Sequence, residues 1–256
     1  MANIWRTWYR VTGTRRIPRG CILEPEVAQA ILGNTEISRS HMTPEIKLFL
    51  LTPNCDLYHA PFSSVSEANE TKKRVFSEPF WSIYWPGGQA LTRFILDEGK
   101  NVISTSEKSV LDLGTGCGAA AIAAKLVGAK TVLANDIDKV ACAAVSMNAA
   151  LNHVELQVSQ EDLLQRSTSE KLADVILVGD MLYDEEIAVR LIPWLEKARE
   201  NGTRIYLGDP GRHGLTENLK KNLKLLKRYS LPENVRKENH GYQQCEIWEY
   251  LGSKRN

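Results

Sequence analysis

The sequence predicts an α/β fold in which a mostly parallel sheet is covered by helices on both faces. Three observations support this prediction. An apolar run at 110–113 leads directly into a glycine-rich turn and a helical segment. A second apolar run at 131–134 follows that helix, and further apolar runs alternate with helical segments almost to residue 250. Such alternation is typical of βα units whose strands pair in parallel.

The segment from Val110 to Gly118 reads VLDLGTGCG and is the most informative unit of the chain. We expect a buried strand, a tight turn through Gly114, Thr115 and Gly116, and a helix over 119–127. Such a turn brings backbone N–H groups to a ligand, and its glycines let that ligand approach closely. The alternative interpretation is a turn that only tightens the junction between strand and helix.

Asp112 lies in this strand, two residues before the first glycine of the turn. A carboxylate here would repel the pyrophosphate of a dinucleotide unless it pointed away. S-adenosylmethionine has no phosphate, and a carboxylate can hold its ammonium group while loop amides bind its carboxylate end. Asp112 therefore favours S-adenosylmethionine over NAD as the cofactor.

The second predicted strand ends at Asn135, and Asp136 and Ile137 follow it. An acid at this point can accept hydrogen bonds from both ribose hydroxyls of an adenosine, whichever cofactor carries it. We therefore assign Asp136 and Ile137 to the cofactor site. The alternative for Asp136 is a helix cap.

The third predicted strand, at 154–158, leads to Asp162 and Leu163. Here a carboxylate could accept from the adenine amino group, and a leucine could cover the face of the ring. The alternative for Asp162 is a helix cap or a solvated loop residue.

Composition excludes several classes of function. The 256 residues carry 32 basic and 31 acidic side chains, and a net charge of +1 gives no global attraction to nucleic acid or membranes. No apolar run approaches membrane-spanning length. The five cysteines are scattered without a C-x-x-C pair and the histidines are isolated, so we expect free thiols in a reducing compartment and no metal. No repeat or heptad indicates an oligomer.

The start of the chain differs in composition from the rest. Five arginines, interleaved with aromatic and aliphatic residues, precede the first acid, Glu24. A basic, acid-free, amphipathic start is typical of a mitochondrial transit peptide, although a disordered basic tail or an RNA-binding arm has similar composition. We expect a transit peptide at 1–22, an N-terminal extension with substrate and cofactor lid elements at 23–100, and the domain that contains the sheet at 101–256.

Two segments of the extension have distinct patterns. Thr43 and Pro44 are typical of a helix start, and the apolar residues that follow predict a short helix that Pro53 ends. The serine-rich stretch at 60–73 predicts an exposed loop.

Aromatic residues are concentrated at 80–85, just before a helix predicted at 89–97. Trp81 and Tyr84 are as well explained by the core as by a ligand. Trp85 directly precedes a Pro-Gly-Gly turn, and we expect its ring to face a bound ligand such as a cationic sulfonium or a lysine chain.

The remaining chain alternates strand and helix. We expect strands at 174–178 and 204–207, helices at 185–199 and 216–226, and a final antiparallel pair, 229–235 with 243–250, with no helix between its members. In such sheets ligands bind beyond the carboxyl ends of the strands. The motifs GDMLY at 179–183 and GDPGR at 208–212 fall at such ends.

Taken together, the glycine loop and the motifs WPGGQAL, ANDID, GDMLYDE and GDPGR resemble the seven-β-strand (class I) protein lysine methyltransferases that carry a D-x-x-Y motif, here Asp180 to Tyr183. The match is best with the group that methylates the electron transfer flavoprotein β subunit in the mitochondrial matrix, and it spans most of the chain after residue 22. It implies a Rossmann-like sheet of order 3-2-1-4-5-7-6 whose last strand is antiparallel. It also implies S-adenosylmethionine as methyl donor and lysines of that subunit as acceptors.

The resemblance assigns the acceptor site to Trp85, Asp180, Tyr183 and Asp209, with Asp180 and Tyr183 as the catalytic residues. Only a neutral amine attacks, and a free lysine has a pKa of ~10.4. We expect a partly dry channel lined by Trp85 and Tyr183 to lower that pKa, and Asp180 to orient the amine. The alternatives are a helix cap for Asp180, a core position for Tyr183 and an ordinary Asp-Pro-Gly turn for Asp209.

Other functions remain compatible with these residues. A class I methyltransferase could act on another protein, a nucleic acid or a small molecule. The Asn/Asp-Pro-Pro-aromatic motif expected for an exocyclic adenine amine is absent. A non-catalytic scaffold that keeps a cofactor fold is the third possibility.

Overall fold

The computed structural model describes residues 23–60, 70–103, 108–166, 170–239 and 241–253. The transit peptide expected at 1–22 lies outside the described residues, as does 61–69 of the loop expected at 60–73. The loop was predicted to extend to residue 73, which was wrong, because helix α5 (Glu70–Phe76) already begins at Glu70. Its Val75 and Phe76 are buried among the N-terminal elements, which favours a helix.

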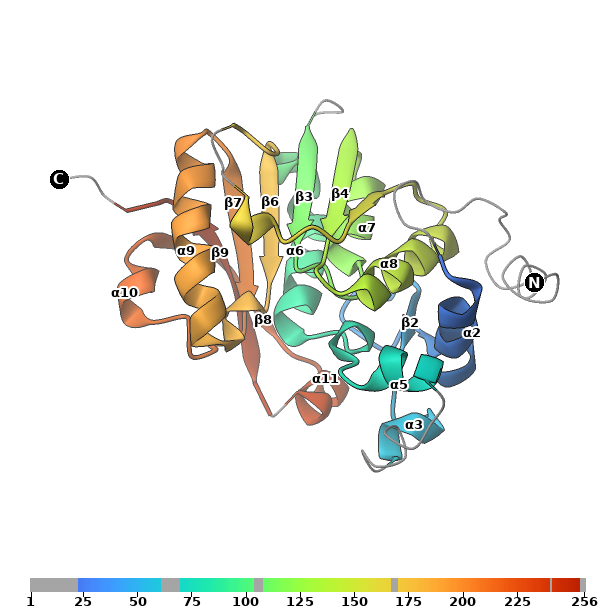
Figure 1. Ribbon diagram of the computed structural model, residues 1–256. Helices are drawn as coiled ribbons and strands as arrows, with labels where there is room; N and C mark the ends of the chain where they lie inside the picture. The colour runs from blue at the N-terminus through green and yellow to red at the C-terminus, as the bar shows by residue number, and fades with distance from the viewer. Residues whose placement is uncertain (1–22, 61–69, 104–107, 167–169, 240, 254–256) are drawn as a thin grey trace.

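Seven strands of the described chain form one sheet: β3 (Ser109–Leu113), β4 (Thr131–Asn135), β5 (Gln157–Ser159), β6 (Val175–Gly179), β7 (Arg204–Asp209), β8 (Leu223–Ser230) and β9 (Gln244–Tyr250). Their order is β5-β4-β3-β6-β7-β9-β8, with β9 antiparallel to both neighbours (Figure 1). The predicted order 3-2-1-4-5-7-6 and the antiparallel last strand are confirmed.

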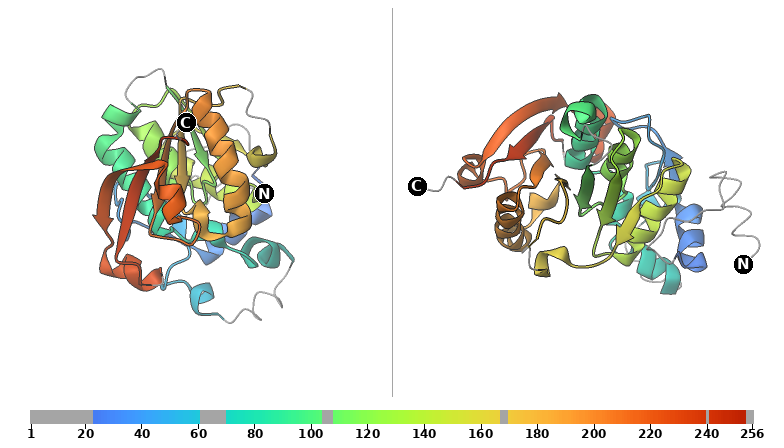
Figure 2. Two further views of the ribbon diagram at one scale, coloured as in Figure 1. Left: turned by 90° about the vertical axis from the view of Figure 1, so that its left-hand side faces the viewer. Right: turned by 90° about the horizontal axis from the view of Figure 1, so that it is seen from above.

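Helices cover both faces of this sheet. The residues of β3 alternate, so that Val110 faces a core shared with α6 (Pro86–Val102), α7 (Ala119–Leu126) and α8 (Lys139–Leu151). Leu111 and Leu113 face the opposite core, which α9 (Glu185–Glu200) covers. The views in Figure 2 show the twist of the sheet between these layers.

The helix predicted from Thr43 to Pro53 was wrong. Leu48–Leu50 is strand β2, which pairs antiparallel with β1 (Glu36–Ser38). The reason is tertiary: all three residues of β2 are buried, and the N–H of Phe49 donates to Oδ1 of Asn148 in α8 at 2.8 Å. Contacts with α8 thus override the local helix signal.

Helices α2 (Pro25–Asn34), α3 (Asp56–His59) and the 3₁₀ turn η1 (Phe80–Ser82) complete the described part of the extension. Trp81 and Tyr84 are buried at 2% and 6% exposure, so the core interpretation of these two aromatics is correct.

The C-terminal elements differ in part from expectation. The helix predicted over 216–226 is only α10 (Glu217–Lys220), because Leu223 already begins the edge strand β8. The strand predicted to continue to residue 235 ends at Ser230, and α11 (Glu233–Glu238) follows Pro232. The antiparallel pairing of the last two strands is nevertheless confirmed, although a helix lies between them.

Candidate functional site

The N-terminus of α6 lies directly against the carboxyl ends of β6 and β7. A Cβ atom on Gly87 would lie 2.3 Å from the carbonyl oxygen of Gly208, and one on Gly208 would lie 2.3 Å from that of Gly87. A Cβ on Gly179 would lie 2.9 Å from Cα of Gly88. Only glycine permits such close approach of two backbones. The motifs WPGG, GDMLY and GDPGR therefore meet at one place.

Asp180 connects these three motifs. Its Oδ2 accepts from the N–H of Gly88 at 2.7 Å, and its Oδ1 accepts from Nε of Arg212 at 2.9 Å in an ion pair that brings Nη2 within 2.8 Å of the same oxygen. Burial raises the pKa of the carboxyl to about 6, against the opposing effects of the Arg212 charge and the hydrogen bonds from Gly88 and Arg212. The carboxylate does not cap the helical segments that follow it in the chain, because Asp184 caps α9, accepting from the N–H groups of Glu186 and Ile187. Through Gly88 it instead satisfies an N–H group in the first turn of α6.

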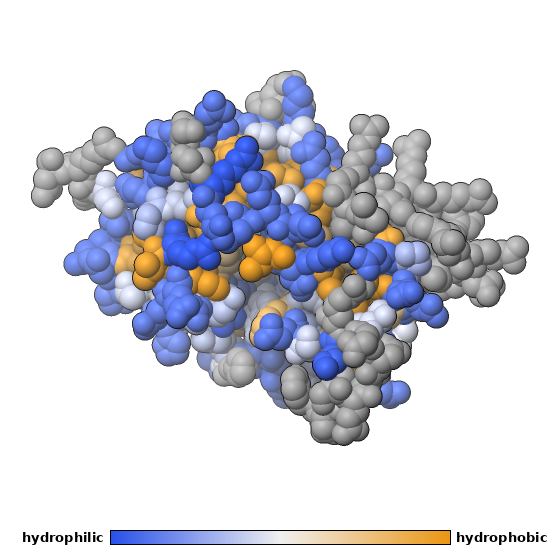
Figure 3. Space-filling model, viewed as in Figure 1, coloured by the Kyte–Doolittle hydropathy of each residue, from blue (hydrophilic) through white to orange (hydrophobic). Residues whose placement is uncertain are grey.

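Aromatic rings lie around this ion pair. The guanidinium carbon of Arg212 lies 5.4 Å from the centre of the Trp85 ring, whose Nε1 donates to the carbonyl of Phe80 at 3.0 Å. Tyr183 and Phe80 are 56% and 60% exposed. Tyr183 is therefore not a core residue. Figure 3 shows that hydrophobic residues form several small patches among mostly hydrophilic ones on one face of the molecule.

The glycine loop follows β3, as predicted. Gly114, Gly116 and Gly118 have φ of +63°, +54° and +82°, which other residues rarely adopt. Asp112 is 3% exposed, and its Oδ2 accepts from the Thr115 hydroxyl at 2.6 Å and the N–H of Ala121 at 2.9 Å. Burial raises the pKa of Asp112 to about 7. The Asp112 carboxylate thus links Thr115 of the glycine loop to Ala121 in the first turn of α7.

Asp136 lies at the end of β4, beside the same loop. Its Oδ2 accepts from the N–H of Gly116 at 3.0 Å and its Oδ1 from that of Asp138 at 3.0 Å. The cap of α8 is Asp138, whose Oδ1 accepts from Val140. Burial raises the pKa of Asp136.

The remaining predicted residues have varied surroundings. The carboxylate of Asp162 accepts from Leu164, Gln165 and Arg190. It caps the 3₁₀ turn η2 (Leu163–Gln165), and Leu163 is buried in the core under α9. The hydrogen bond from Arg190 lowers the pKa of Asp162. The adenine contact proposed for Asp162 and Leu163 stays a prediction.

Asp209 shapes its own turn. Its Oδ1 accepts from the N–H groups of Gly211 and Arg212, both at 2.7 Å, while its Oδ2 is buried without a hydrogen-bond partner among the described residues. The interpretation as an Asp-Pro-Gly turn accounts for one oxygen, and the role of Asp209 in the acceptor site stays a prediction.

Two residues of this region were missed from the sequence. Arg212 was not predicted to be a site residue, although it is a cation that follows two strand-end acids, Asp180 and Asp209, and this was the available signal. Asn148 carried no signal, because its role depends on tertiary contacts: it is fully buried, and its Nδ2 donates to the carbonyl of Cys117 in the glycine loop at 2.8 Å.

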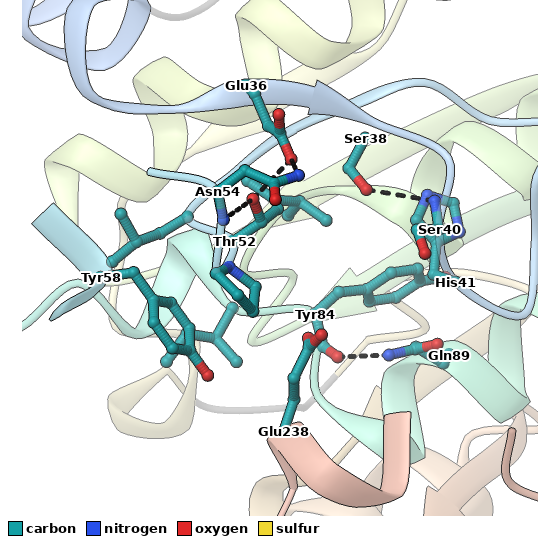
Figure 4. Close-up of a pocket in the computed structure, with 14 residues that line it drawn as sticks. Glu36, Ser38, Ser40, His41, Thr52, Asn54, Tyr58, Tyr84, Gln89 and Glu238 are labelled. Carbon is teal, nitrogen blue, oxygen red and sulfur yellow. Dashed lines mark hydrogen bonds between the residues drawn. The ribbon is translucent and has the colours of Figure 1, made fainter. Parts of the chain in front are cut away.

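A separate cavity of about 250 Å³ lies between the β1/β2 hairpin, α3, α11 and the start of α6 (Figure 4). Glu36, His41, Tyr58 and Glu238 are among its lining residues, and none of the predicted site residues is. Within the described ranges, no cluster of three or more His, Cys, Asp or Glu could hold a metal ion. No helix in those ranges is long and apolar enough to cross a membrane.

Comparisons with known proteins extend this description. The family model for ribosomal protein L11 methyltransferase (PrmA) matches residues 89–208. The electron transfer flavoprotein beta subunit lysine methyltransferase of Xenopus laevis is 41% identical over 239 residues, covering 90% of this chain and 92% of that protein. The Homo sapiens protein of the same name is 40% identical, with coverages of 90% and 84%. The solved ribosomal protein L11 methylase of Lactobacillus delbrueckii subsp. bulgaricus has a TM-score of 0.43 at 23% identity, covering 63% of this chain and 79% of that one.

Proposed function

The chain belongs to the family of electron transfer flavoprotein beta subunit lysine methyltransferases, and we propose that it methylates lysine side chains of that flavoprotein subunit with S-adenosylmethionine. One observation carries the link between cofactor and acceptor: a Cβ on Gly114 would lie 2.7 Å from Sδ of Met181, so the glycine loop touches the GDMLY segment. A methyl group held at the loop would therefore lie next to the acceptor residues.

The glycine loop fits this cofactor. A Cβ on Gly116 would meet no atom within 4 Å, so the space over the loop is open, and Asp136 lies at its side. Ile137 is 72% exposed and can cover an adenine ring. Asp136 would hold the ribose hydroxyls, and the loop amides would hold the carboxylate end. Bound there, S-adenosylmethionine supplies a methyl group on a positively charged sulfur.

The acceptor site must hold a lysine and release its proton. An ionised carboxylate offers about four acceptor positions, two on each oxygen. On Asp180 the guanidinium of Arg212 lies against Oδ1, and the N–H of Gly88 takes one position on Oδ2. The remaining position, on Oδ2, can orient the amine, while the rings of Trp85 and Tyr183 flank its apolar stem. Correct placement of the amine should contribute more than acid–base catalysis, because methyl transfer is an in-line displacement.

We place the enzyme in the mitochondrial matrix on the composition of residues 1–22. A fluorescent protein fused after residue 22 should enter mitochondria, and the chain without residues 1–20 should stay outside while keeping its activity in vitro. Mitochondrial accumulation of the truncated chain would contradict this location.

The substrate proposal is tested with labelled S-adenosylmethionine and three acceptors: the purified flavoprotein β subunit, ribosomal protein L11 and total RNA. We expect label on lysines of the flavoprotein subunit, located by mass spectrometry. Label only on L11 or RNA would reject this substrate and keep the reaction class. Cofactor binding without transfer to any protein in a mitochondrial extract would favour a non-catalytic scaffold.

A further inference from the structure

Arg212 stands in a turn whose backbone is held in place. The turn follows β7, and Asp209 accepts the N–H groups of Gly211 and Arg212 through one oxygen, both at 2.7 Å. Gly211 has a φ of +102°. Because these bonds fix the start of the side chain, Arg212 is directed toward the end of β6 with little freedom.

The guanidinium of Arg212 contacts three separate segments. Its Nε donates to Oδ1 of Asp180 at 2.9 Å, its Nη2 lies 2.8 Å from the same oxygen, and the two side chains are 13% and 8% exposed. Its central carbon lies 5.4 Å from the ring centre of Trp85 and 5.9 Å from that of Tyr242. One side chain thus joins the end of β6, the start of α6 and the segment before β9.

Arg212 is also the cation that balances the charge of Asp180. A buried carboxylate without a partner takes up a proton at neutral pH, and the Arg212 charge is the coulombic effect that opposes protonation here. Among the other titratable groups of the described chain, Asp209 acts on Asp180 directly, and Cys245, Tyr183 and Tyr242 lie beside the pair. Glu246 and Lys220 interact with Asp209. Glu246 is itself paired with Arg228 at the surface.

We propose that Arg212 is a positioning residue of the methyl-transfer site, which keeps the Asp180 carboxylate ionised and holds the Trp85 ring where the substrate lysine enters. The proposal rests on the proposed function only in taking Asp180 and Trp85 as the residues that receive the lysine. Lysine cannot replace arginine fully at this position, because the planar fork both pairs with the carboxylate and stacks on the rings.

The first test needs no protein substrate. In protein labelled with ¹³C at aspartate carboxyls, the signal of Asp180 is identified by its loss in Asp180→Asn and followed as a function of pH. We expect Arg212→Met to move its titration upward by at least one pH unit and Arg212→Lys to move it less. Arg166→Met, which removes an ion pair with Glu161 between two exposed side chains, is the matched control and should leave the Asp180 titration unchanged. An unchanged titration in Arg212→Met would overturn the proposal.

The second test measures kcat/KM for the flavoprotein β subunit against pH. We expect the kcat/KM of Arg212→Met to be at least tenfold below the parental value at pH 7 and to recover in part as the pH rises. Its Kd for S-adenosylmethionine should stay within threefold of the parental value. Parental activity with a parental pH profile would overturn the proposal. If Arg212→Met does not fold, Arg212→Gln, which also removes the charge, serves with the same criteria. An inactive parental enzyme would reject the substrate, whereas the carboxyl titration would still decide the role of Arg212.

Discussion

The carboxylate of Asp136 accepts a hydrogen bond from the backbone N–H of Gly116 at 3.0 Å, and it thereby joins the end of β4 to the glycine loop. The same carboxylate is the predicted partner of the cofactor ribose. One side chain would thus both shape the loop and bind the ligand that the loop receives.

Asp136→Ala should therefore weaken S-adenosylmethionine binding by about 1.5 to 3 kcal/mol, because a charge-assisted contact is lost. Calorimetry on folded protein measures the change. Asp138→Asn is the matched control, since Asp138 caps α8 and asparagine also caps helices. The Asp138→Asn protein should bind S-adenosylmethionine with the parental affinity. Parental affinity in Asp136→Ala would leave Asp136 only the loop contact.

Asp112 should make stability depend on pH. Burial raises its pKa from 3.8 to about 7, so between these values the folded protein holds a proton that the unfolded chain releases. The contribution of Asp112 to the free energy of unfolding therefore falls as the pH rises from about 4 to about 7. Asp112→Asn cannot titrate at this position. Between pH 4 and pH 7 its free energy of unfolding should therefore fall by roughly 2 to 4 kcal/mol less than that of the parental protein.

Urea unfolding of both proteins at several pH values between 4.5 and 7.5 checks this expectation. Parallel pH profiles would show that Asp112 does not take up a proton on folding. The same Asp112→Asn protein also tests the predicted contact with the cofactor ammonium, because asparagine keeps the bonds to Thr115 and Ala121 but removes the charge.

The sheet and its ligand edge could be predicted because their signals are local. Short buried strands, glycine turns and strand-end acids occur within a few residues of each other, as in the segment from Val110 to Gly118. Strand β2 could not be predicted, since the N–H of Phe49 bonds to Asn148 and the N–H of the preceding Lys47 bonds to Asn152, 99 and 105 residues further along the chain. The Asp180–Arg212 pair could not be predicted either, because its two residues follow different strands and lie 32 residues apart in the chain.

The contact between Gly87 and Gly208 gives a stability prediction. Gly208→Ala places a Cβ 2.3 Å from the Gly87 carbonyl and 2.8 Å from Cβ of Leu91, and overpacking of this kind costs about 1 to 3 kcal/mol or more. Gly33→Ala in α2 is the control, because its Cβ would meet no atom within 4 Å and alanine favours helix. Urea unfolding should show a loss for the first and a small gain for the second. A Gly208→Ala protein of parental stability would mean that the backbones separate easily.

Tyr183 should act through its ring. It is 56% exposed, so its ring is accessible to the stem of a substrate lysine. Tyr183→Phe should keep kcat/KM for the flavoprotein subunit within about threefold, whereas Tyr183→Ala should lose at least about tenfold, or ~1.4 kcal/mol. If the phenylalanine variant is as slow as the alanine variant, the hydroxyl takes part in the reaction.

Asp180→Asn should lower turnover at least about tenfold, or ~1.4 kcal/mol in the barrier, while the affinity for S-adenosylmethionine changes less. The melting temperature should also fall, because Arg212 loses its buried partner.

The pH profile separates the charge of Asp180 from its structural role. Lysine deprotonation gives log kcat/KM a slope of about 1 against pH over the neutral range. In the parental enzyme protonation of Asp180, whose pKa burial raises to about 6, should steepen this slope toward about 2 at lower pH. Asp180→Asn has no such group and should keep the single slope. A folded Asp180→Asn protein that binds cofactor and methylates lysine at the parental rate would remove Asp180 from the acceptor site and leave it as the link between Gly88 and Arg212.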